Sequence, residues 1–313
     1  MRAALGHPLA EYLDIAGELR AALRAGDPVV ALESSVIAAG LPRPHNLAAA
    51  RTCEAAVRAE GAVPATIAVL GGRIRIGLAP AELENLAARD DVEKASRRDL
   101  AHLLARGRDG ATTVAGTLVC ARLAGIAIFA TGGIGGVHRG WRDTLDISAD
   151  LEELPRANLA VVCAGAKSIL DLPATLEYLE TRGVPVIGYG TDEFPAFHAR
   201  RSGLRLDRRV DRPEDAARVM LAQRRLGLDG AVVFAVPCPA SAAMDEAVLD
   251  GHVRAAVCAA TAAGVRGQAL TPYLLARIAE ASGGASLAAN LALLENNART
   301  AARIAQAYSR LKI

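Results

Sequence analysis

Short apolar runs alternate with helical patterns along most of this chain, and this alternation restricts the fold more than any other feature. Apolar runs with abrupt ends are typical of buried strands, and the amphipathic segments between them are typical of helices that cover a sheet. We therefore predict an α/β fold, an α/β/α sandwich on a largely parallel central sheet. The expected strands are residues 28–32, 66–70, 73–77, 126–130, 159–163, 185–189 and 230–236, and the expected helices are residues 79–88, 99–106, 113–123, 172–181 and 214–226.

The glycine pair at residues 71–72 lies between two apolar runs, which predicts an antiparallel hairpin and therefore a mixed sheet. Residues 159–189 read as one βαβ unit. After residue 236 the pattern is only helical, so we expect a helical C-terminal part whose last helix is capped by Ser286. Its helices are expected at 240–263, 271–281 and 286–311. Since no linker rich in Pro, Gly or Ser and no repeat is visible, residues 1–313 are predicted to be a single domain.

Composition and charge narrow the functional class. The formal net charge is +2, and no block of Lys and Arg is interleaved with aromatic residues, so a nucleic-acid polymer is not an expected partner. The five cysteines are widely spaced, which is typical of reduced, mostly buried thiols in a cytosolic protein. Glu11 and Asp14 come too early for the apolar region of a signal peptide, and Arg122 breaks the longest apolar stretch, residues 117–130. We expect a cytoplasmic protein without a membrane span.

Polar side chains follow four of the predicted strands. Glu33 follows the first strand, Thr131 the strand at 126–130, and Lys167 comes shortly after the strand at 159–163. In sheets of this kind, residues just past the carboxyl ends of parallel strands line the binding site. We therefore expect these groups to meet on one rim, together with the polar residues at the end of the fourth strand, which are Tyr189, Thr191, Asp192 and Glu193.

Lysine is rare in this chain. Lys and Arg total 36 residues, and the lysines among them are Lys94, Lys167 and Lys312. Arginine keeps its charge in proteins, whereas a desolvated lysine can lose its proton and attack a carbonyl carbon. A lysine at the end of a buried strand, as Lys167 is expected to be, suits that chemistry. Incomplete compositional drift explains the same count, and on the count alone the two explanations are equally good.

The glycine-rich segment at residues 131–140 also contains His138 and Arg139. Successive glycines let backbone N–H groups approach an anion closely, so a phosphate is the natural ligand. The segment is neither a Walker loop nor a good dinucleotide fingerprint, because no Gly-Lys-Ser/Thr and no clear helix follow it. A tightly turned surface loop is the alternative, and His138, Arg139 and Thr131 favour phosphate or substrate binding.

Carboxylates supply the remaining candidates. Asp143, Asp146 and Asp150 can ligate a hard divalent cation or simply solvate a loop, and one carboxylate plus waters on Mg²⁺ or Mn²⁺ is the expected form. Glu33 lies between an apolar strand and two serines. Partial burial would raise its pKa and suit it to acid–base work, while capping or ion pairing at the strand end is the alternative.

Other polar residues have less specific contexts. Lys94 forms a basic cluster with Arg97 and Arg98, which suits binding of a phosphate or pairing with a network of carboxylates. The alternative is that these residues are simply solvated at the start of a helix. Asn290 is a poor helix former within a predicted helix, which favours a side chain that points into the site. Asn296 and Asn297 are equally suited to contacts between subunits. The isolated histidines are treated as structural: His45, His102, His198 and His252.

At these residues the chain resembles the pseudouridine-5′-phosphate glycosidase family, which also includes indigoidine-synthesis A-like proteins. The resemblance runs from about residue 28 to the C-terminus, in the same linear order, and the glycine-rich run is its most specific part. The matching segments are 31–37 (ALESSVI), 40–46 (GLPRPHN), 94–100 (KASRRDL), 110–115 (GATTVA), 130–140 (ATGGIGGVHRG), 146–151 (DISADL), 162–171 (VCAGAKSILD), 271–275 (TPYLL), 286–290 (SLAAN) and 295–297 (ENN).

The resemblance implies roles. Lys167 matches the family's Schiff-base lysine, Glu33 its proton donor and Asp146 its Mn²⁺ ligand, so one divalent cation per subunit and no organic cofactor are expected. The family cleaves pseudouridine 5′-phosphate reversibly to uracil and ribose 5-phosphate in pseudouridine catabolism, and its members are typically homotrimers with an α/β/α core. The positions implied to contact or line the substrate site are Lys94, Val114, Thr131, His138, Ser148, Ala149, Asp150 and Asn290.

The implied chemistry agrees with the residues. A C–C glycosidic bond has no easy leaving heteroatom, so the paired carboxylates of ordinary glycosidases suit it poorly. An amine that forms an imine at C1′ supplies an electron sink, and uracil can leave once its C5 is protonated. Lys167 is the expected nucleophile and Glu33 the expected acid.

The chain departs from the family at residues 235–243 and at Gln268, where a Lys is common. These departures leave the lysine and the carboxylates intact and bear on the nucleobase end of the pocket. Two other functions use the same residues. One is another Schiff-base lyase or aldolase acting on a phosphorylated sugar, and the other is a nucleotide-binding homologue without activity.

Overall fold

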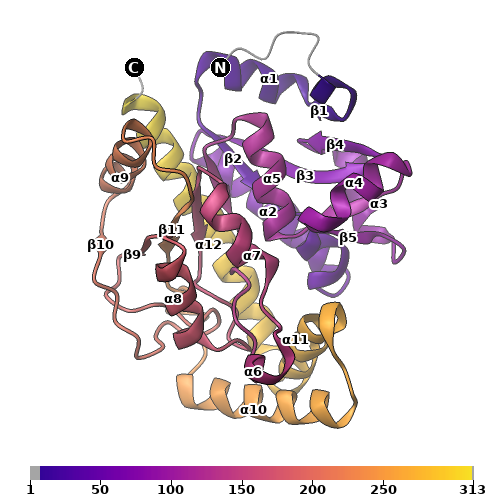
Figure 1. Cartoon of the computed structure of the whole chain (residues 1–313), viewed down its shortest axis with the longest axis vertical. Helices are drawn as coiled ribbons and strands as arrows, with labels where there is room; N and C mark the ends of the chain where they lie inside the picture. The colour runs from indigo at the N-terminus through magenta and orange to yellow at the C-terminus, as the bar shows by residue number, and fades with distance from the viewer. Residues whose placement is uncertain (1–7, 312–313) are drawn as a thin grey trace.

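The computed structural model describes residues 8–311, and within that range one mixed sheet of eleven strands forms the centre of the molecule. Nine strands follow the order β1-β4-β3-β2-β7-β8-β11-β9-β10, while β6 pairs with β3 and β5 pairs with β6. Figure 1 shows these strands between the helices. The strands are β1 (Leu13–Ile15), β2 (Val29–Leu32), β3 (Val63–Leu70), β4 (Arg73–Ile76), β5 (Glu93–Ala95), β6 (Gly110–Thr112), β7 (Ile128–Ala130), β8 (Ala160–Cys163), β9 (Val186–Tyr189), β10 (Arg209–Val210) and β11 (Val232–Ala235).

Most strand pairs are parallel. The antiparallel pairs among the described strands are β3 with β4, which form the predicted hairpin, and β3 with β6. Strands β2, β7 and β8 are direct neighbours, with Leu32 opposite Ala130 and Ala130 opposite Val162. Their carboxyl ends therefore finish side by side on one edge.

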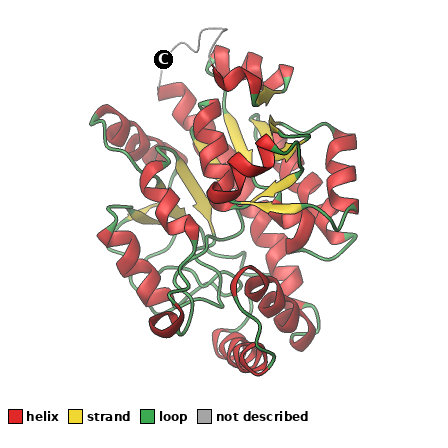
Figure 2. Ribbon diagram, turned by 45° about the vertical axis from the view of Figure 1, so that its right-hand side comes forward, coloured by secondary structure: helices red, strands yellow, loops and turns green. Residues whose placement is uncertain are grey.

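Helices cover both faces of the sheet, as Figure 2 shows. The α-helices are α1 (Gly17–Ala25), α2 (His45–Ala59), α3 (Pro80–Ala88), α4 (Arg97–Ala105), α5 (Val114–Ala124), α6 (Trp141–Thr144), α7 (Ala149–Glu153), α8 (Leu172–Thr181), α9 (Pro213–Arg225), α10 (Glu246–Ala262), α11 (Leu270–Ala281) and α12 (Ala285–Leu311). A π-helical turn spans Val36–Gly40, and 3-10 turns span Pro8–Glu11, Leu154–Arg156 and Gly267–Ala269.

Alternation along each strand divides the core in two. In β2, Val30 and Leu32 pack with α2, α9 and α12, whereas Val29 and Ala31 face the helices of the other side, including α5, α8 and α10. Phe129 of β7 is fully buried between these layers. Burial of apolar area on both faces is the main favourable contribution to such a fold. The predicted α/β/α sandwich with a mixed, largely parallel sheet is confirmed.

The helical C-terminal part is also confirmed, with corrections at two helix starts. Helix α10 begins at Glu246 rather than at residue 240, because Asp245 caps it by accepting bonds from the N–H groups of Ala247 and Val248 at 2.9 and 3.0 Å. Ser286 is not the cap of the last helix. It lies inside α12, and its N–H donates to Ser282 Oγ at 3.2 Å.

The predicted βαβ unit is wrong in one respect. Strands β8 and β9 flank α8 in sequence, but β11 lies between them in the sheet. A strand more than forty residues later in the chain therefore separates two strands that we expected to be neighbours. Sequence patterns also missed the short strands β1, β5, β6 and β10 and the helices α1, α2, α6 and α7.

The predictions about membrane spans and cysteines can also be compared with the structure. Among the described residues no helix is long and apolar enough to cross a membrane. Cys53, Cys120, Cys163 and Cys238 are buried free thiols, as expected, and Cys258 is exposed. Lys312 lies outside the described residues, and the single domain stays a prediction.

Candidate functional site

A cavity of about 490 Å³ lies where β2, β7 and β8 end. Most of the site residues predicted from the sequence line it, including all those implied by the resemblance, whereas Arg139, Asp143 and the polar residues after β9 do not. The lining residues implied by the resemblance are Glu33, Lys94, Val114, Thr131, His138, Asp146, Ser148, Ala149, Asp150, Lys167 and Asn290. The structure therefore brings most of the predicted site together, whereas the role of each residue stays a prediction.

Backbone pairing beyond the strands fixes the segments that carry Thr131 and Lys167. The N–H of Thr131 donates to Val162 O at 3.0 Å, which continues the β7–β8 register past the end of β7. Further along, Ile134 N donates to Gly165 O at 3.0 Å and Lys167 N to Ile134 O at 3.1 Å. The lysine is thus held against the glycine-rich loop by a short ladder.

Glu33 is half-buried at the end of β2 and accepts hydrogen bonds from the hydroxyl groups of Thr131 and Ser35. Burial raises the pKa of Glu33, while the charge of Lys167 and the two hydroxyl bonds oppose the rise and the charge of Asp150 adds to it. Since burial dominates, the carboxyl group stays protonated to a higher pH than an exposed Glu. That property suits a general acid.

Lys167 is half-buried on the same cavity, and its charge influences several neighbours. The pKa of Lys94 on β5 is lowered, first by burial and then by the charge of Lys167. Burial lowers the pKa of His138 as well, and Lys167 adds to this while Asp146 opposes it. The cavity therefore gathers titratable groups whose environments differ from water, which is characteristic of functional sites.

Asp146 is the carboxylate best placed for a metal ion. Its Oδ2 lies 4.0 Å from His138 Nδ1, and its backbone carbonyl accepts from His138 N at 3.0 Å. Asp143 is exposed and does not line the cavity. Asp150 is buried, and its oxygens accept from Ala115 N at 2.9 Å and Gly135 N at 2.7 Å.

Within residues 8–311 no group of three or more His, Cys, Asp or Glu side chains is placed to hold a metal ion. A single half-buried carboxylate on an open cavity does not match Zn²⁺, which takes several protein ligands. It fits Mg²⁺ or Mn²⁺ with mostly water ligands. Binding of such an ion at Asp146 stays a prediction.

The glycine-rich loop owes its glycines to close packing. A Cβ at Gly135 would clash with the side chain of Ser148, and one at Gly133 would lie 2.6 Å from the Phe197 ring. Several loop N–H groups already donate within the protein, so these are not directed at a ligand. They belong to Thr131, Ile134, Gly135, Val137 and His138. Phosphate binding by the loop backbone stays a prediction, and these five N–H groups do not support it.

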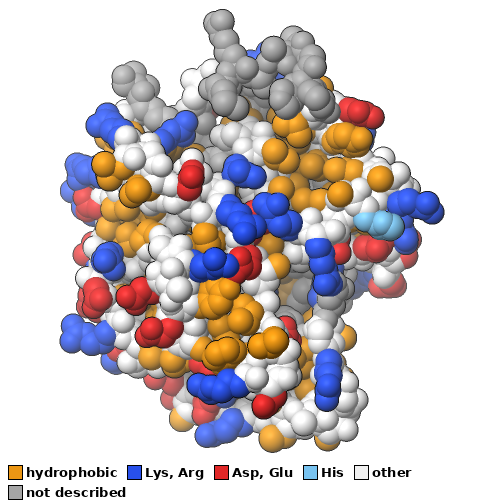
Figure 3. Space-filling view, in the orientation of Figure 1, with side chains coloured by type: hydrophobic (Ala, Val, Ile, Leu, Met, Phe, Trp, Pro, Cys, Tyr) orange, Lys and Arg blue, Asp and Glu red, His pale blue; other side chains and the backbone are white. Residues whose placement is uncertain are grey.

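The basic cluster predicted around Lys94 lies on the rim of the cavity. Arg97 forms an ion pair with the buried carboxylate of Glu153, so its charge is compensated. Arg98 is 73% exposed, and its nearest described acid is Asp99 at 3.5 Å. Basic and acidic side chains are interspersed over the face of the molecule drawn in Figure 3.

Several lining residues were not predicted. Ser35 was missed although it lies only two residues after Glu33. Phe197 was missed because its position, in the left-handed backbone region at φ 61°, depends on tertiary packing. Thr271 and Leu275 of α11 lie in a segment that carried the family resemblance, so a signal for them was present.

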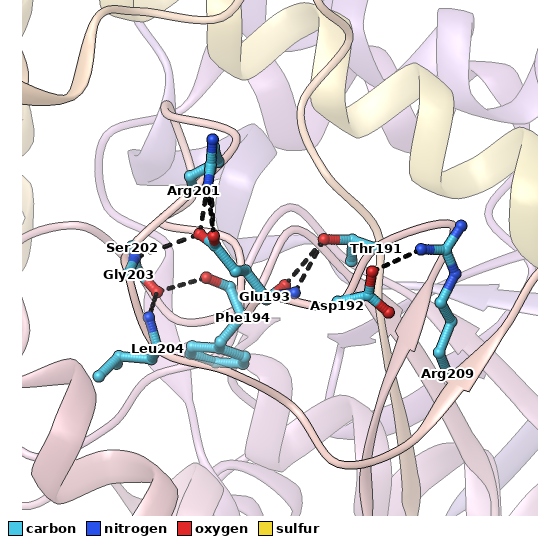
Figure 4. A network of polar contacts seen from close by, with 9 residues as sticks. All are labelled: Thr191, Asp192, Glu193, Phe194, Arg201, Ser202, Gly203, Leu204 and Arg209. Carbon is cyan, nitrogen blue, oxygen red and sulfur yellow. Dashed lines mark hydrogen bonds and ion pairs between the residues drawn. The ribbon is translucent and has the colours of Figure 1, made fainter.

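The fourth strand end does not reach the cavity. Thr191, Asp192 and Glu193 follow β9 and form a separate network, drawn in Figure 4. Glu193 accepts from Arg201 Nη2 at 2.6 Å, and Asp192 accepts from Arg209 Nη1 at 2.8 Å. The prediction that this end joins the site is wrong, because β11 separates β9 from β8.

One of the two departures from the family pattern lies away from the cavity. Residues 235–243 do not line the cavity, and within them the carbonyl of Cys238 accepts from Arg200 Nη1 at 2.6 Å. Gln268 belongs to a 3-10 turn, and its side chain lies outside the described part of the structure. Of the isolated histidines, His198 is buried, lies 3.2 Å from Ser168 Oγ, and has a pKa lowered to about 4 by burial. None of these histidines lines the cavity.

A family model described as indigoidine synthase A like protein matches residues 18–307 of the chain. The chain belongs to this family. The family that the sequence motifs indicated is therefore confirmed. The matched range covers almost the whole chain and includes every residue that lines the cavity.

Curated relatives support the same assignment and are enzymes by name. The chain is 64% identical over 302 residues to a protein of Rhodospirillum centenum named pseudouridine-5′-phosphate glycosidase, covering 96% of this chain and 94% of that one. A protein of Caldanaerobacter subterraneus with the same name is 52% identical over 300 residues, covering 96% and 98% of the two chains. The prediction of an enzyme of this family is confirmed.

Solved structures agree with the fold. The prealnumycin C-glycosynthase AlnA, in complex with ribulose 5-phosphate, has a TM-score of 0.89 and 42% identity, covering 96% of this chain and 98% of that one. An indigoidine synthase A-like protein of Thermotoga maritima has a TM-score of 0.86 and 33% identity, covering 96% and 97%.

Proposed function

We propose that this protein cleaves the C–C glycosidic bond of pseudouridine 5′-phosphate reversibly, giving uracil and ribose 5-phosphate in pseudouridine catabolism. The observation that carries the proposal is the meeting of Lys167 with a protonatable Glu33 on one cavity. The names of the curated relatives support this substrate. The solved structure of the C-glycosynthase AlnA with ribulose 5-phosphate supports the reaction class.

In the proposed reaction Lys167 acts as the nucleophile. The C1′–O4′ bond breaks, O4′ takes up a proton, and the lysine Nζ forms a bond to C1′. The C1′–C5 bond then breaks, uracil C5 takes up a proton, and the nitrogen lone pair forms the imine. Water hydrolyses the imine, which releases ribose 5-phosphate and restores the amine. One water is consumed in each turnover.

Glu33 is the proposed proton donor. Its pKa is raised mainly by burial, so the group keeps its proton to a higher pH than an exposed Glu does. The hydroxyl groups of Thr131 and Ser35 fix its two oxygens. The acid is therefore already oriented toward the cavity when substrate enters.

The remaining lining residues are proposed to bind the substrate. Lys94 and the exposed Arg98 give the cavity a basic side that suits the phosphate. Asp146 would hold a divalent cation, Mn²⁺ in this proposal, which supplies charge stabilisation and orientation when bound. The proposed contacts to the rest of the substrate are Val114, Thr131, His138, Ser148, Ala149, Asp150 and Asn290.

Release of uracil from pseudouridine 5′-phosphate tests the proposal. We expect stoichiometric uracil and ribose 5-phosphate, and the reverse reaction from the same two products. Borohydride reduction in the presence of ribose 5-phosphate should add a sugar phosphate to the peptide that contains Lys167. A trapped adduct without uracil release would favour another Schiff-base lyase or aldolase. The absence of both would favour a nucleotide-binding protein without activity.

The assembly and the compartment are also proposals. We propose a cytoplasmic homotrimer, as the resemblance implies. The Ala-rich helix α12 does not add to this proposal, because most of its apolar residues are buried within its own chain. Light scattering of the purified protein should give three times the 32.4 kDa of one chain. A mass of one or two chains would contradict the trimer.

A further inference from the structure

Asn297 is a buried amide on α12 that reaches the glycine-rich loop from the far end of the sequence. Its side chain is fully buried, and Nδ2 donates to Thr131 O at 2.9 Å and to Gly132 O at 3.2 Å. It does not line the substrate cavity. Its contacts are therefore with the backbone that supports the site.

Asn297 is connected to the proposed acid, Glu33, through one intermediate residue, Thr131. Thr131, whose carbonyl accepts from Asn297, donates its own hydroxyl to Glu33. Helix α12 approaches the same turn closely, since a Cβ at Gly132 would lie 3.2 Å from Leu294 and 3.3 Å from Leu293. The helix, the loop and the carboxyl group thus form one continuous path.

The other end of the amide is unpaired. Asn297 Oδ1 is buried and has no hydrogen-bond partner among the described residues. An unpaired buried acceptor costs stability, and the two bonds that Nδ2 donates offset part of that cost. An unpaired buried group of this kind calls for an explanation, and a role in function is one.

We infer that Asn297 is a positioning residue for Glu33: it fixes the Thr131–Gly132 carbonyls so that the Thr131 hydroxyl stays on the carboxyl group. This inference rests on the proposed function, in which Glu33 is the acid. Asn297 holds the acid in its productive orientation and has no contact with the substrate. A displacement of about 1 Å at such a group can lower a rate about 100-fold.

The test compares Asn297→Leu with Asn296→Leu, its neighbour on the same helix, which is half-buried and does not line the cavity. We expect Asn297→Leu to lower kcat about 10- to 100-fold with KM changed less than about 2-fold, and to lower Tm modestly because the Thr131 carbonyl loses its donor. Asn296→Leu should retain wild-type kcat. An unchanged kcat in Asn297→Leu, or a loss that appears in KM rather than in kcat, would overturn the inference.

Thr131→Val tests the same path from its other end without changing α12. If Asn297 acts through Thr131, the double variant should lose no more activity than Thr131→Val alone, whereas independent roles would multiply the two losses. This comparison remains informative if Asn297→Leu folds poorly, because Asn297→Ser, which keeps one donor, can take its place. Multiplied losses in either pairing would overturn the inference.

The pKa of Glu33 gives a readout that does not depend on turnover. Loss of the Thr131 bond, which stabilises the carboxylate, should raise the pKa of Glu33 further in Asn297→Leu. Carbon-13 NMR of the Glu carboxyl groups, assigned with Glu33→Gln, measures it. The charges that act on the pKa of Glu33 are those of Lys167 and Asp150. The other titratable groups that line its cavity are Lys94, Arg97, Arg98, Asp99, His138 and Asp146. Glu54 and Glu295 act on Cys53, which lines a second, small cavity together with Glu33.

This measurement also separates the two proposals. If wild-type protein releases no uracil, the proposed function fails, while a raised Glu33 pKa in Asn297→Leu would still support the positioning role. If wild-type protein is active and the Glu33 pKa is the same in both proteins, the positioning role fails and the proposed function stands.

Discussion

Two regions of this molecule have polar residues directly after buried strands, but the residues of only one region line the candidate site. At β2, β7 and β8 the polar residues after the strands meet on a cavity of about 490 Å³. At β9 the polar residues form a closed surface network with two arginines (Figure 4). Polar residues at a strand end therefore indicate a site only where the strands are neighbours, and strand order decides this.

The two regions also differ in how charge is compensated. In the β9 network each acid has an arginine of its own, and Glu193 has a pKa lowered chiefly by its bond to Arg201. At the cavity, burial dominates and raises the pKa of Glu33 although Lys167 opposes it. Compensated charges stabilise a loop modestly, whereas desolvated groups at a cavity are available for proton transfer.

The largest effect is expected at Lys167. Lys167→Arg keeps the charge and most of the volume but cannot form an imine, so kcat should fall about 1,000-fold or more while the protein stays folded. Uracil release measures the activity, and mass spectrometry after borohydride reduction measures the adduct. Lys94→Arg is the matched control, because Lys94 lines the same cavity and is proposed only to bind substrate. An adduct on Lys94, or substantial activity in Lys167→Arg, would show that the nucleophile is assigned wrongly.

The next effect is expected at Glu33. Glu33→Gln keeps the shape but removes the acid, so kcat should fall about 100- to 10,000-fold. Because burial raises the pKa of Glu33, the protonated form survives above the usual range of a carboxyl group, and wild-type activity should decline only as pH rises through that raised pKa. The residual activity of Glu33→Gln should lack this decline. The same decline in both proteins would assign it to another group.

A smaller effect is expected from the metal. Chelation, or Asp146→Asn, should lower kcat about 10- to 100-fold, and Mn²⁺ should restore the chelated wild-type enzyme best. Asp143→Asn is the matched control, since this exposed Asp in the same segment does not line the cavity. Full activity of metal-free enzyme would remove the cation from the mechanism.

Much of this arrangement could be predicted from local sequence. The glycine pair at residues 71–72 predicted the β3–β4 hairpin. The apolar runs of β2, β7 and β8 end next to polar residues, and these residues line the cavity. Periodicity and turn residues are local signals, so they survive without knowledge of the tertiary fold. The motifs around Lys167 and Asp146 added the roles, which spacing alone left open.

What could not be predicted depends on distant segments. The insertion of β11 between β8 and β9 is decided by packing of whole units, and no residue near β9 signals it. Short strands such as β5, with three residues, carry too little periodicity to recognise. Asn297 and Thr131, which are hydrogen-bonded, lie 166 residues apart in the sequence. No local pattern connects them, so the sequence was equally consistent with a contact between Asn297 and another subunit. Its side chain in fact bonds within its own chain.

The smallest effect is expected at Glu193, and it tests the comparison from the other side. Glu193→Gln removes a charge that bonds Arg201 and, more weakly, Gly203 N at 3.3 Å, in a pair whose arginine is 68% exposed. Exposed ion pairs of this kind contribute little, so Tm at pH 7 should fall by no more than about 3 °C and kcat should stay within about 2-fold of wild type. The pKa of Glu193 is lowered in the folded protein, so its contribution to stability is present above the ordinary pKa of a Glu and is lost as pH falls through the lowered value. Thermal unfolding of both proteins at several pH values should therefore show the Tm difference at pH 7 and its disappearance in acid. A large loss of uracil release in Glu193→Gln would mean that the β9 end serves the reaction after all, and that strand adjacency is the wrong criterion for separating the two regions.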